Sequence, residues 1–411
     1  MSYLLLIIFI IILLYKYNKA CCFIVAFYPL LSMIGMTDSI NLFQTLSIIS
    51  ILLFILKYHN INRIKFPFYL TIILIIVSYT ISNLMNIAHW PTSIAIIASE
   101  YIFTIVFWSI VSNKNNRIYF FRYFVIFISI ICLYEVYEFL TQSNPLYDFY
   151  VNSSMFIGYD ADRSEDIRFG TMRCHSLMRD VGAMGTICCM AFCIFFFHLK
   201  NGLKNINTYY LYILIALCII CTFLTGTRTV ILALIFSMII ISMSLNLKRK
   251  LYLWLLSSFM IIIFIDYFQE IIMSFYDTQS VSGSSTYMRH WQYLIVMNAF
   301  EKSPLYGLGL EGTSIVINRY VGAFGLESVW FQILINYGLL GVIAFSASLL
   351  QGFYFSLKYK NIIAFTIVAL FLLVKTMSSI PGIGNGYFLY IIIYLIKCKN
   401  SIYENRYNNN A

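Results

Sequence analysis

The segment CTFLTGTRTVILALIF, residues 221–236, holds a single arginine, Arg228, between two apolar stretches. The arginine lies in a short polar break that contains Thr225, Gly226, Thr227 and Thr229. Holding an arginine at membrane depth costs about 2.5–3.5 kcal/mol on insertion scales, so such a residue usually faces a polar cavity rather than lipid. Because helices are interrupted in a membrane only where they line protein or a cavity, the segment predicts a broken helix junction. The two apolar stretches are then the ends of two separate helices.

The composition of the whole chain places this junction in a membrane. Of the 411 residues, 61% are hydrophobic and 11% are charged, and the mean hydropathy is +0.83, unlike a soluble domain. We therefore expect an all-α, polytopic integral membrane protein with about 12–13 transmembrane helices, forming one domain over residues 1–411. The ten cysteines lie mainly in apolar stretches without metal-ligand spacing, so we expect neither zinc nor a disulfide framework.

The positions of the basic residues predict how the chain is oriented across the membrane. Eighteen of the 27 basic residues gather in alternate loops, together with one acid, Glu404. Positively charged loops face the cytoplasm, so we expect the N-terminus on the outer side of the membrane and the C-terminus in the cytoplasm. The net charge of +10 then reflects topology and predicts no nucleic-acid partner. Apolar runs between polar breaks predict helices at residues 3–15, 20–36, 42–56, 66–84, 93–111, 118–140, 181–198, 207–225, 229–245, 251–269, 328–350, 362–377 and 386–396.

Two of the outer loops in this scheme are long, residues 141–180 and 270–327. We expect both to face the periplasm and to carry the chemistry, because long loops often hold functional residues; a simple cover over the membrane surface is the alternative. Within the second loop, the apolar periodicity of residues 287–300 predicts a helix along the membrane surface or against the bundle. The first loop ends in DIRFGTMRCHSLMRDVGAMG, which carries Arg168, Arg173, His175, Arg179 and Asp180.

Arginine and lysine are distributed differently over the two sides. The inner loops are rich in lysine, whereas the outer side has only Lys302 and Lys375. Arginine binds phosphate through two parallel hydrogen bonds and keeps its charge when partly desolvated, so the outer face is a candidate anion site. For each arginine alone, snorkelling to the interface or pairing with an acid is an equal alternative. The candidate residues are Arg168, Arg173, Arg179, Arg228, Arg289 and Arg319.

Four segments, in the correct order, are similar to those of a known family, the bacterial O-antigen polymerase and O-antigen ligase superfamily. RFGTMRCHSLMRDVGAMG resembles its "R-x-x-G … HP … G" loop and the helix that follows. TGTRTVILALIF resembles its segment of Ser-Arg plus small residues. MRHWQYLIVMNAFEKSPLYGLGLEG resembles its "R … W … A … PLFGxG" segment, and ESVWFQILINYGLLG its closing "ILxxxGLLG" helix. The resemblance covers about residues 165–345, and the first 140 residues match only in their number of helices.

The resemblance implies a GT-C-like glycosyltransferase that works without metal or cofactor on the outer side of the cytoplasmic membrane. Its substrate would be an undecaprenyl-pyrophosphate-linked oligosaccharide, its surroundings membrane lipid, and a possible protein partner a chain-length regulator. Arg228 and Arg289 would hold the pyrophosphate and neutralise the charge that develops as it leaves. Trp291 and Tyr287 would offer aromatic faces to a sugar.

One position separates the two activities of this superfamily. Where the ligases have a histidine in an HNxYL-like string, this chain has Glu327 and Ser328, which favours a Wzy-type polymerase. A glycosyltransferase also gains from a base that takes the proton of the attacking hydroxyl, and Glu327 is our first candidate, with His175 the second. An O-antigen ligase and a flippase or transporter of lipid-linked oligosaccharide remain alternatives; the transporter would favour midplane charges open to both sides or paired repeats. A structural membrane protein without substrate is a third.

Overall fold

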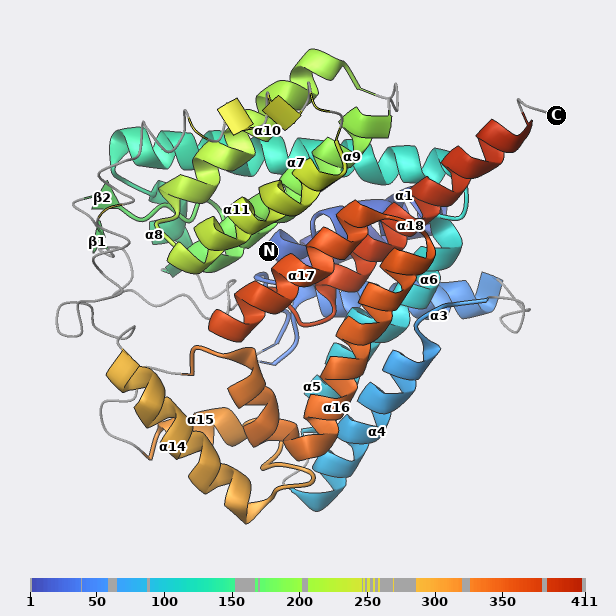
Figure 1. Cartoon of the computed structure of the whole chain (residues 1–411). Helices are drawn as coiled ribbons and strands as arrows, with labels where there is room; N and C mark the ends of the chain where they lie inside the picture. The colour runs from blue at the N-terminus through green and yellow to red at the C-terminus, as the bar shows by residue number, and fades with distance from the viewer. Residues whose placement is uncertain are drawn as a thin grey trace.

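The computed structural model describes residues 2–37, 39–57, 65–86, 89–151, 167–168, 171–201, 206–245, 247, 250–251, 254–255, 258, 269, 286–319, 326–378 and 383–408. These residues are largely helical (Figure 1), which confirms the predicted all-α fold. Two short strands, β1 (Ile167–Arg168) and β2 (Thr171–Met172), pair in antiparallel orientation. The helices are α1 (Ser2–Ala26), α2 (Tyr28–Leu31), α3 (Leu42–Lys57), α4 (Tyr69–Met85), α5 (Trp90–Ile96), the π-helical turn η2 (Ile97–Ile102), α6 (Phe103–Ile110), α7 (Lys114–Thr141), α8 (Pro145–Val151), α9 (Val181–Asn201), α10 (Thr208–Leu224), α11 (Arg228–Met243), α14 (Thr286–Lys302), α15 (Gly312–Ile317), α16 (Val329–Lys358), α17 (Ile362–Met377) and α18 (Tyr387–Asn408).

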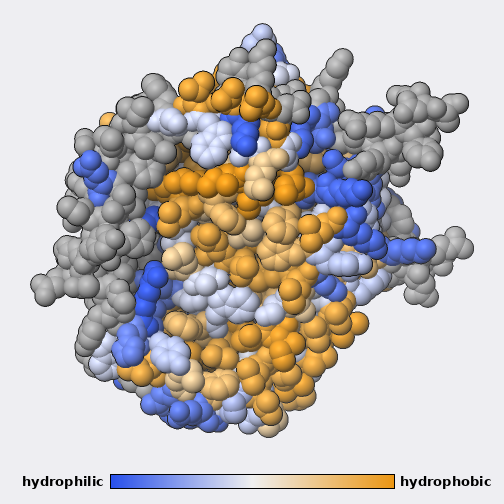
Figure 2. All heavy atoms as spheres, in the orientation of Figure 1, coloured by the Kyte–Doolittle hydropathy of each residue, from blue (hydrophilic) through white to orange (hydrophobic). Residues whose placement is uncertain are grey.

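The helices have the length and surface of a polytopic membrane protein, as predicted. Among the described residues, five helical runs have the length and apolar composition to cross a membrane: α1, the continuous run Trp90–Ile110, α7, α9 and α16. Shorter apolar helices are α3, α4, α10, α11 and α17. On the face shown in Figure 2, hydrophobic residues fill a broad band between hydrophilic margins at its left and right. An exposed apolar area of this size marks a membrane-facing surface. The predicted helix 251–269 lies mostly outside the described residues.

The centre of the bundle is formed by helices that are apolar on every side. α17 packs against α11, α16 and α18, and α9 packs against α10 (Figure 1). Residues 387–396 of α18 are completely buried, as are nearly all residues of α9. A helix that is hydrophobic all round belongs in such an interior. This explains why the predicted helix 386–396 is apolar although its predicted length is short for a span.

α1 is not a straight rod. Lys16 has non-helical angles, with φ −133° and ψ 49°, and the rings of Phe9 and Phe23 lie 5.6 Å apart. Fourteen residues of straight helix would separate these rings by about 21 Å. The chain therefore turns back at Lys16, as the two predicted helices 3–15 and 20–36 require. The second of them is interrupted before α2, which begins with a Tyr-Pro pair.

Two lysines contact aromatic rings of neighbouring helices. The ammonium of Lys19 lies 4.3 Å from the ring centroid of Tyr119, and that of Lys57 lies 5.7 Å from the centroid of Tyr17. These contacts bring the bend of α1, the end of α3 and the start of α7 to one end of the bundle. The alternating basic loops predict this grouping, and the side of the membrane on which it lies stays a prediction.

α16 is also two helices rather than one. Gly338 has φ 60° and ψ −154°, a region that is essentially restricted to glycine. The rings of Trp330 and Phe345 lie 5.0 Å apart, although a straight helix would separate them by about 22 Å. The predicted single helix 328–350 is therefore wrong, because residues 329–337 fold back onto the rest of α16.

The segment 303–309, which contains the PLYGLG sequence, fits against this break. The loop and the break exchange backbone hydrogen bonds in both directions, which pairs groups that the interrupted helix leaves without a partner. The bonds run from Leu308 N–H to Ile335 O (2.7 Å), Gly309 N–H to Asn336 O (3.0 Å), Leu339 N–H to Pro304 O (2.9 Å) and Leu340 N–H to Leu305 O (3.1 Å). Two motifs that are about 30 residues apart in sequence thus form one structural unit.

Candidate functional site

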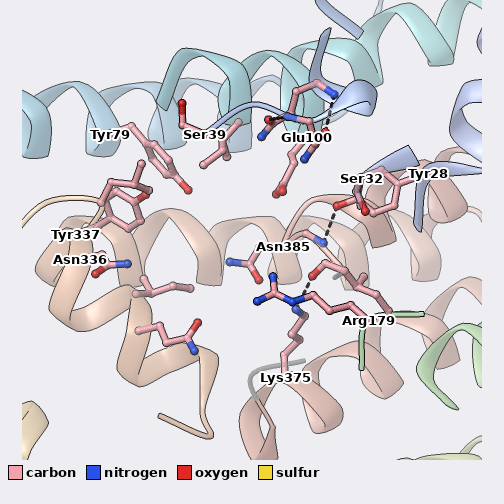
Figure 3. Close-up of a pocket in the computed structure, with 18 of the residues that line it drawn as sticks. Tyr28, Ser32, Ser39, Tyr79, Glu100, Arg179, Asn336, Tyr337, Lys375 and Asn385 are labelled. Carbon is pink, nitrogen blue, oxygen red and sulfur yellow. Dashed lines mark hydrogen bonds between the residues drawn. The ribbon is translucent and has the colours of Figure 1, made fainter. Parts of the chain in front are cut away.

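A polar cavity of about 400 Å³ lies among the helices of the bundle (Figure 3). It is enclosed by the starts of α3 and α18, the end of α17, the turn η2 and residues 332–337 of α16. Polar side chains dominate its wall, although the surrounding helices are apolar. The polar and ionisable residues of the wall are Tyr28, Ser32, Ser39, Asn41, Gln44, Tyr79, Glu100, Arg179, Gln332, Asn336, Tyr337, Lys375 and Asn385.

Two cations are directed into this cavity (Figure 3). Lys375, in the last turn of α17, donates from Nζ to the carbonyl of Ile383 at 2.7 Å. Arg179 enters from the segment that precedes α9. The next residue, Asp180, accepts a hydrogen bond from the backbone N–H of Gly182 at 2.8 Å, which caps the start of α9. This cap fixes the place at which Arg179 leaves the backbone, so the cavity wall includes one of the predicted anion-binding arginines.

Glu100 supplies the carboxylate of the cavity wall. It lies in the π-helical turn η2, in the middle of an apolar span, and its Oε2 accepts the backbone N–H of Gly386 at 3.0 Å. The backbone N–H of Gly384 donates to the hydroxyl of Tyr28 at 2.6 Å. A Cβ on Gly384 would lie 2.0 Å from Oε1 of Glu100, so this close approach requires glycine. The glycine-rich turn before α18 therefore fits closely around the carboxylate.

Aromatic and amide groups form another part of the wall. The rings of Tyr79 and Tyr337 stack with their centroids 4.1 Å apart. The Oδ1 of Asn336 accepts hydrogen bonds of 2.8 Å from both the backbone N–H and the hydroxyl of Thr313. Gln332 donates to the carbonyl of Leu326 at 3.2 Å. Aromatic surfaces beside fixed amides are suited to a sugar, which has both apolar faces and hydroxyl groups.

His175 lies in an enclosed cluster that does not belong to this wall. Its Nδ1 is 2.9 Å from the carbonyl of Met178, its Nε2 is 3.7 Å from Oε1 of Glu138, and it is 6% exposed. Glu138 accepts hydrogen bonds from Asn144 (2.8 Å) and from the backbone N–H groups of His175 (3.2 Å) and Ser176 (2.7 Å). The cluster holds the segment 174–178 against α7. The contacts of His175 are therefore those of a residue that stabilises the structure.

Arg173 and Arg228 lie at the break between α10 and α11. The chain leaves α10 at Leu224 and enters α11 at Arg228, and the intervening Gly226 has φ 61°, which confirms the predicted broken junction. Arg173 donates from Nε to the carbonyl of Thr225 at 3.2 Å and from Nη2 to the hydroxyl of Thr227 at 3.1 Å. Arg173, a predicted site arginine, thus braces the break at which Arg228 begins α11.

Arg289 and Glu327, both predicted site residues, form an ion pair of 3.3 Å between α14 and the segment that enters α16. Their side chains are 46% and 30% exposed. α14 confirms the predicted helix at 287–300, and its Trp291 is 45% exposed. The side chains of Tyr287 and Arg168 lie outside the described residues. The structure thus brings Arg289 to Glu327 and puts Arg179 in the cavity wall, whereas the other described candidates do not line it.

Sequence reasoning did not select Glu100 or Lys375. The available signal was a carboxylate inside the apolar run 93–111, together with the glycine-rich PGIGNG segment, residues 381–386. An ionisable residue within a membrane segment is by default a candidate for function. Among the described residues, no group of three or more His, Cys, Asp or Glu could hold a metal ion, and metal independence stays a prediction.

Comparison with known proteins gives one family. Residues 213–346 match the family described as O-antigen ligase. The matched region begins in α10 and includes the broken junction at Arg228, helix α14 and the break at Gly338. No curated protein matches the chain.

Proposed function

The match of residues 213–346 supports the O-antigen polymerase/ligase superfamily, and on this basis we propose that the protein is a polymerase of O-antigen or a related surface polysaccharide. It transfers a growing glycan from undecaprenyl pyrophosphate to the next lipid-linked repeat unit. The reaction takes place at the periplasmic face of the inner membrane, with the N-terminus in the periplasm and the C-terminus in the cytoplasm. A chain-length regulator is a proposed partner.

The polar cavity carries this proposal. Arg179 and Lys375 line it together with Glu100 and a stack of two tyrosines. A lipid-linked glycan needs cations for its pyrophosphate and polar and aromatic groups for its sugars, next to an apolar bundle for its tail. When the glycosidic bond breaks, negative charge collects on the pyrophosphate, and cations already in place stabilise that charge.

The predicted arginines outside the cavity are further proposed ligands of pyrophosphate. Arg228, at the α10–α11 break, binds pyrophosphate with Arg173 beside it, and Arg289 does so from α14. Trp291 and Tyr287 on α14 present aromatic faces to the sugars that extend beyond the membrane. Glu327 is proposed as a base for the acceptor hydroxyl, and its ion pair with Arg289 is a competing structural role. His175, held between Met178 and Glu138, is the weaker proposal for the base.

A ligase is the second candidate, because the matched family is described by that activity. A ligase would pass the glycan to the lipopolysaccharide core instead of to another lipid-linked repeat. Glu327 and Ser328 stand where the ligase pattern has its histidine, and this substitution favours the polymerase. Deletion of the gene separates the two activities, because loss of a polymerase leaves single repeats on the core whereas loss of a ligase leaves none.

The proposal is tested with Arg179 and Arg228. Changing either residue to Ala should abolish the polysaccharide ladder and leave a single repeat on the core at an equal protein level. Lys should restore the ladder poorly, since a point charge does not reproduce a two-pronged grip. Arg122, on the basic side of the bundle, provides the matched control, and Arg122→Ala should keep a normal ladder. Normal ladders from both Ala variants at the outer positions would contradict the anion site.

A further inference from the structure

Glu100 is the acid among the residues that line the cavity. We infer that Glu100 is a catalytic residue that accepts the proton of the acceptor sugar hydroxyl during glycosyl transfer. This inference rests on the proposed function and assigns a role that neither Glu327 nor His175 is placed to fill from within the cavity.

The local backbone is built around this side chain. Glu100 lies in a π-helical turn between α5 and α6, and such turns within α-helices are frequent at functional sites. A carboxylate in the middle of an apolar span is expensive to place there. A helix whose only role was packing would need neither the π-helical turn nor the carboxylate. The neighbouring positions of this span hold apolar and small residues.

The two carboxylate oxygens have different surroundings. Oε2 is fixed by the backbone N–H of Gly386 at 3.0 Å. Oε1 faces Gly384, where a Cβ would stand only 2.0 Å away. The absence of side chains at both glycines leaves the carboxylate held by backbone yet half-buried at the cavity wall. This geometry holds a proton acceptor in a fixed position at the cavity wall.

The cations of the cavity are placed to stabilise the leaving group. Lys375 donates from Nζ to the carbonyl of Ile383, which fixes the ammonium at the cavity wall. Arg179 is directed into the same cavity (Figure 3). Acceptor activation and leaving-group stabilisation therefore come from different residues of one cavity.

In the proposed transfer, one bond to the anomeric carbon forms and another breaks. The oxygen of the acceptor hydroxyl forms a bond to the anomeric carbon, while the bond from that carbon to the pyrophosphate oxygen breaks. The bonding electrons remain on the pyrophosphate, whose charge is stabilised by Arg179 and Lys375. The hydroxyl proton passes to Oε1 of Glu100 and is released to water when the products leave.

The other proposed bases have poorer positions for this step. Glu327 is paired with Arg289 at 3.3 Å, and its side chain is 30% exposed. His175 is 6% exposed and lies between Met178 and Glu138. Neither residue belongs to the cavity wall.

The test compares Glu100→Gln with the wild-type protein, both purified and supplied with isolated lipid-linked repeat. Gln keeps the size of the side chain and an oxygen for the Gly386 N–H, but it does not accept a proton. We expect donor affinity to be unchanged and the polymerisation rate to fall about 10²–10⁴-fold. Glu301→Gln, at the exposed end of α14, is the control and should polymerise at the wild-type rate. A further variant, Glu100→Ala, should regain part of its rate when formate is added.

Each outcome has one meaning. A normal rate for Glu100→Gln would overturn the inference and leave the proposed function intact. Loss of donor binding in that variant, with no response of Glu100→Ala to formate, would also overturn it, because Glu100 would then be a binding or folding residue. A wild-type protein that binds the repeat but forms no polymer would instead refute the proposed polymerase and this inference with it.

Discussion

Two glutamates in apolar helices show how the surroundings of a single residue separate structure from chemistry. Glu138 on α7 is fully buried, and both of its oxygens accept hydrogen bonds from the protein. Glu100 has a backbone donor for Oε2 and borders a cavity. The sequence alone presents both as acids within hydrophobic runs. Only the folded contacts distinguish a carboxylate that ties a loop to a helix from one that borders a cavity.

We expect Glu138→Gln to destabilise the protein. The amide has one accepting oxygen, so its NH₂ group would face either Asn144 or the backbone donors of His175 and Ser176. A buried donor left unsatisfied costs about 1–3 kcal/mol, which should lower the melting temperature of the detergent-purified protein by several degrees. Glu301→Gln on the surface should leave this temperature unchanged. An unchanged melting temperature for Glu138→Gln would show that the segment 174–178 is held by other contacts.

At the scale of elements, the two bent helices show what hydrophobic patterns predict and what they miss. The turn at Lys16 was predictable because lysines interrupt the apolar run. The reversal at Gly338 was not, since the surrounding INYGLLG sequence holds no charged residue and no proline to mark a break. Residues 303–309 bind this break through backbone hydrogen bonds. Side-chain hydropathy contains no information about such bonds. The cavity was missed for a different reason. Its residues Glu100, Arg179 and Lys375 come from segments far apart in sequence.

Replacing Gly338 should therefore be costly. Its φ and ψ angles strain any other residue by about 1–3 kcal/mol, and a Cβ would lie 2.6 Å from the backbone carbon of Leu305. We expect Gly338→Ala to reduce both the yield of folded protein and its melting temperature. The control is Gly352→Ala in the same helix, where a Cβ would meet the side chain of Val368 at 3.1 Å and a small shift relieves the contact. Equal stability of the two variants would argue against the reversal.

At the scale of the whole molecule, the distribution of charge makes a prediction about topology. All ten cysteines are buried, so the wild-type protein should react slowly with a membrane-impermeant maleimide. Single cysteines at the exposed positions Ser143 and Ser314 should be labelled in intact spheroplasts, because they follow α7 and lie in α15 on the predicted outer side. Asn115→Cys at the start of α7 should react only after lysis. Labelling of Asn115→Cys from outside would invert the orientation and move the cavity to the cytoplasm.

The backbone hydrogen bonds between residues 303–309 and the break at Gly338 also have a consequence for how the chain is synthesised. We call this pairing the interlock. Residues 303–309 leave the ribosome before residues 335–340, so the first half of the interlock is synthesised before its partner. Until the second half arrives, the peptide groups of this loop must be hydrated, since unpaired backbone groups are not tolerated in hydrocarbon. Correct assembly therefore requires the loop to wait in an aqueous compartment until the reversal docks. A nascent chain that ended just after α15 would lack residues 335–340, with which the loop pairs.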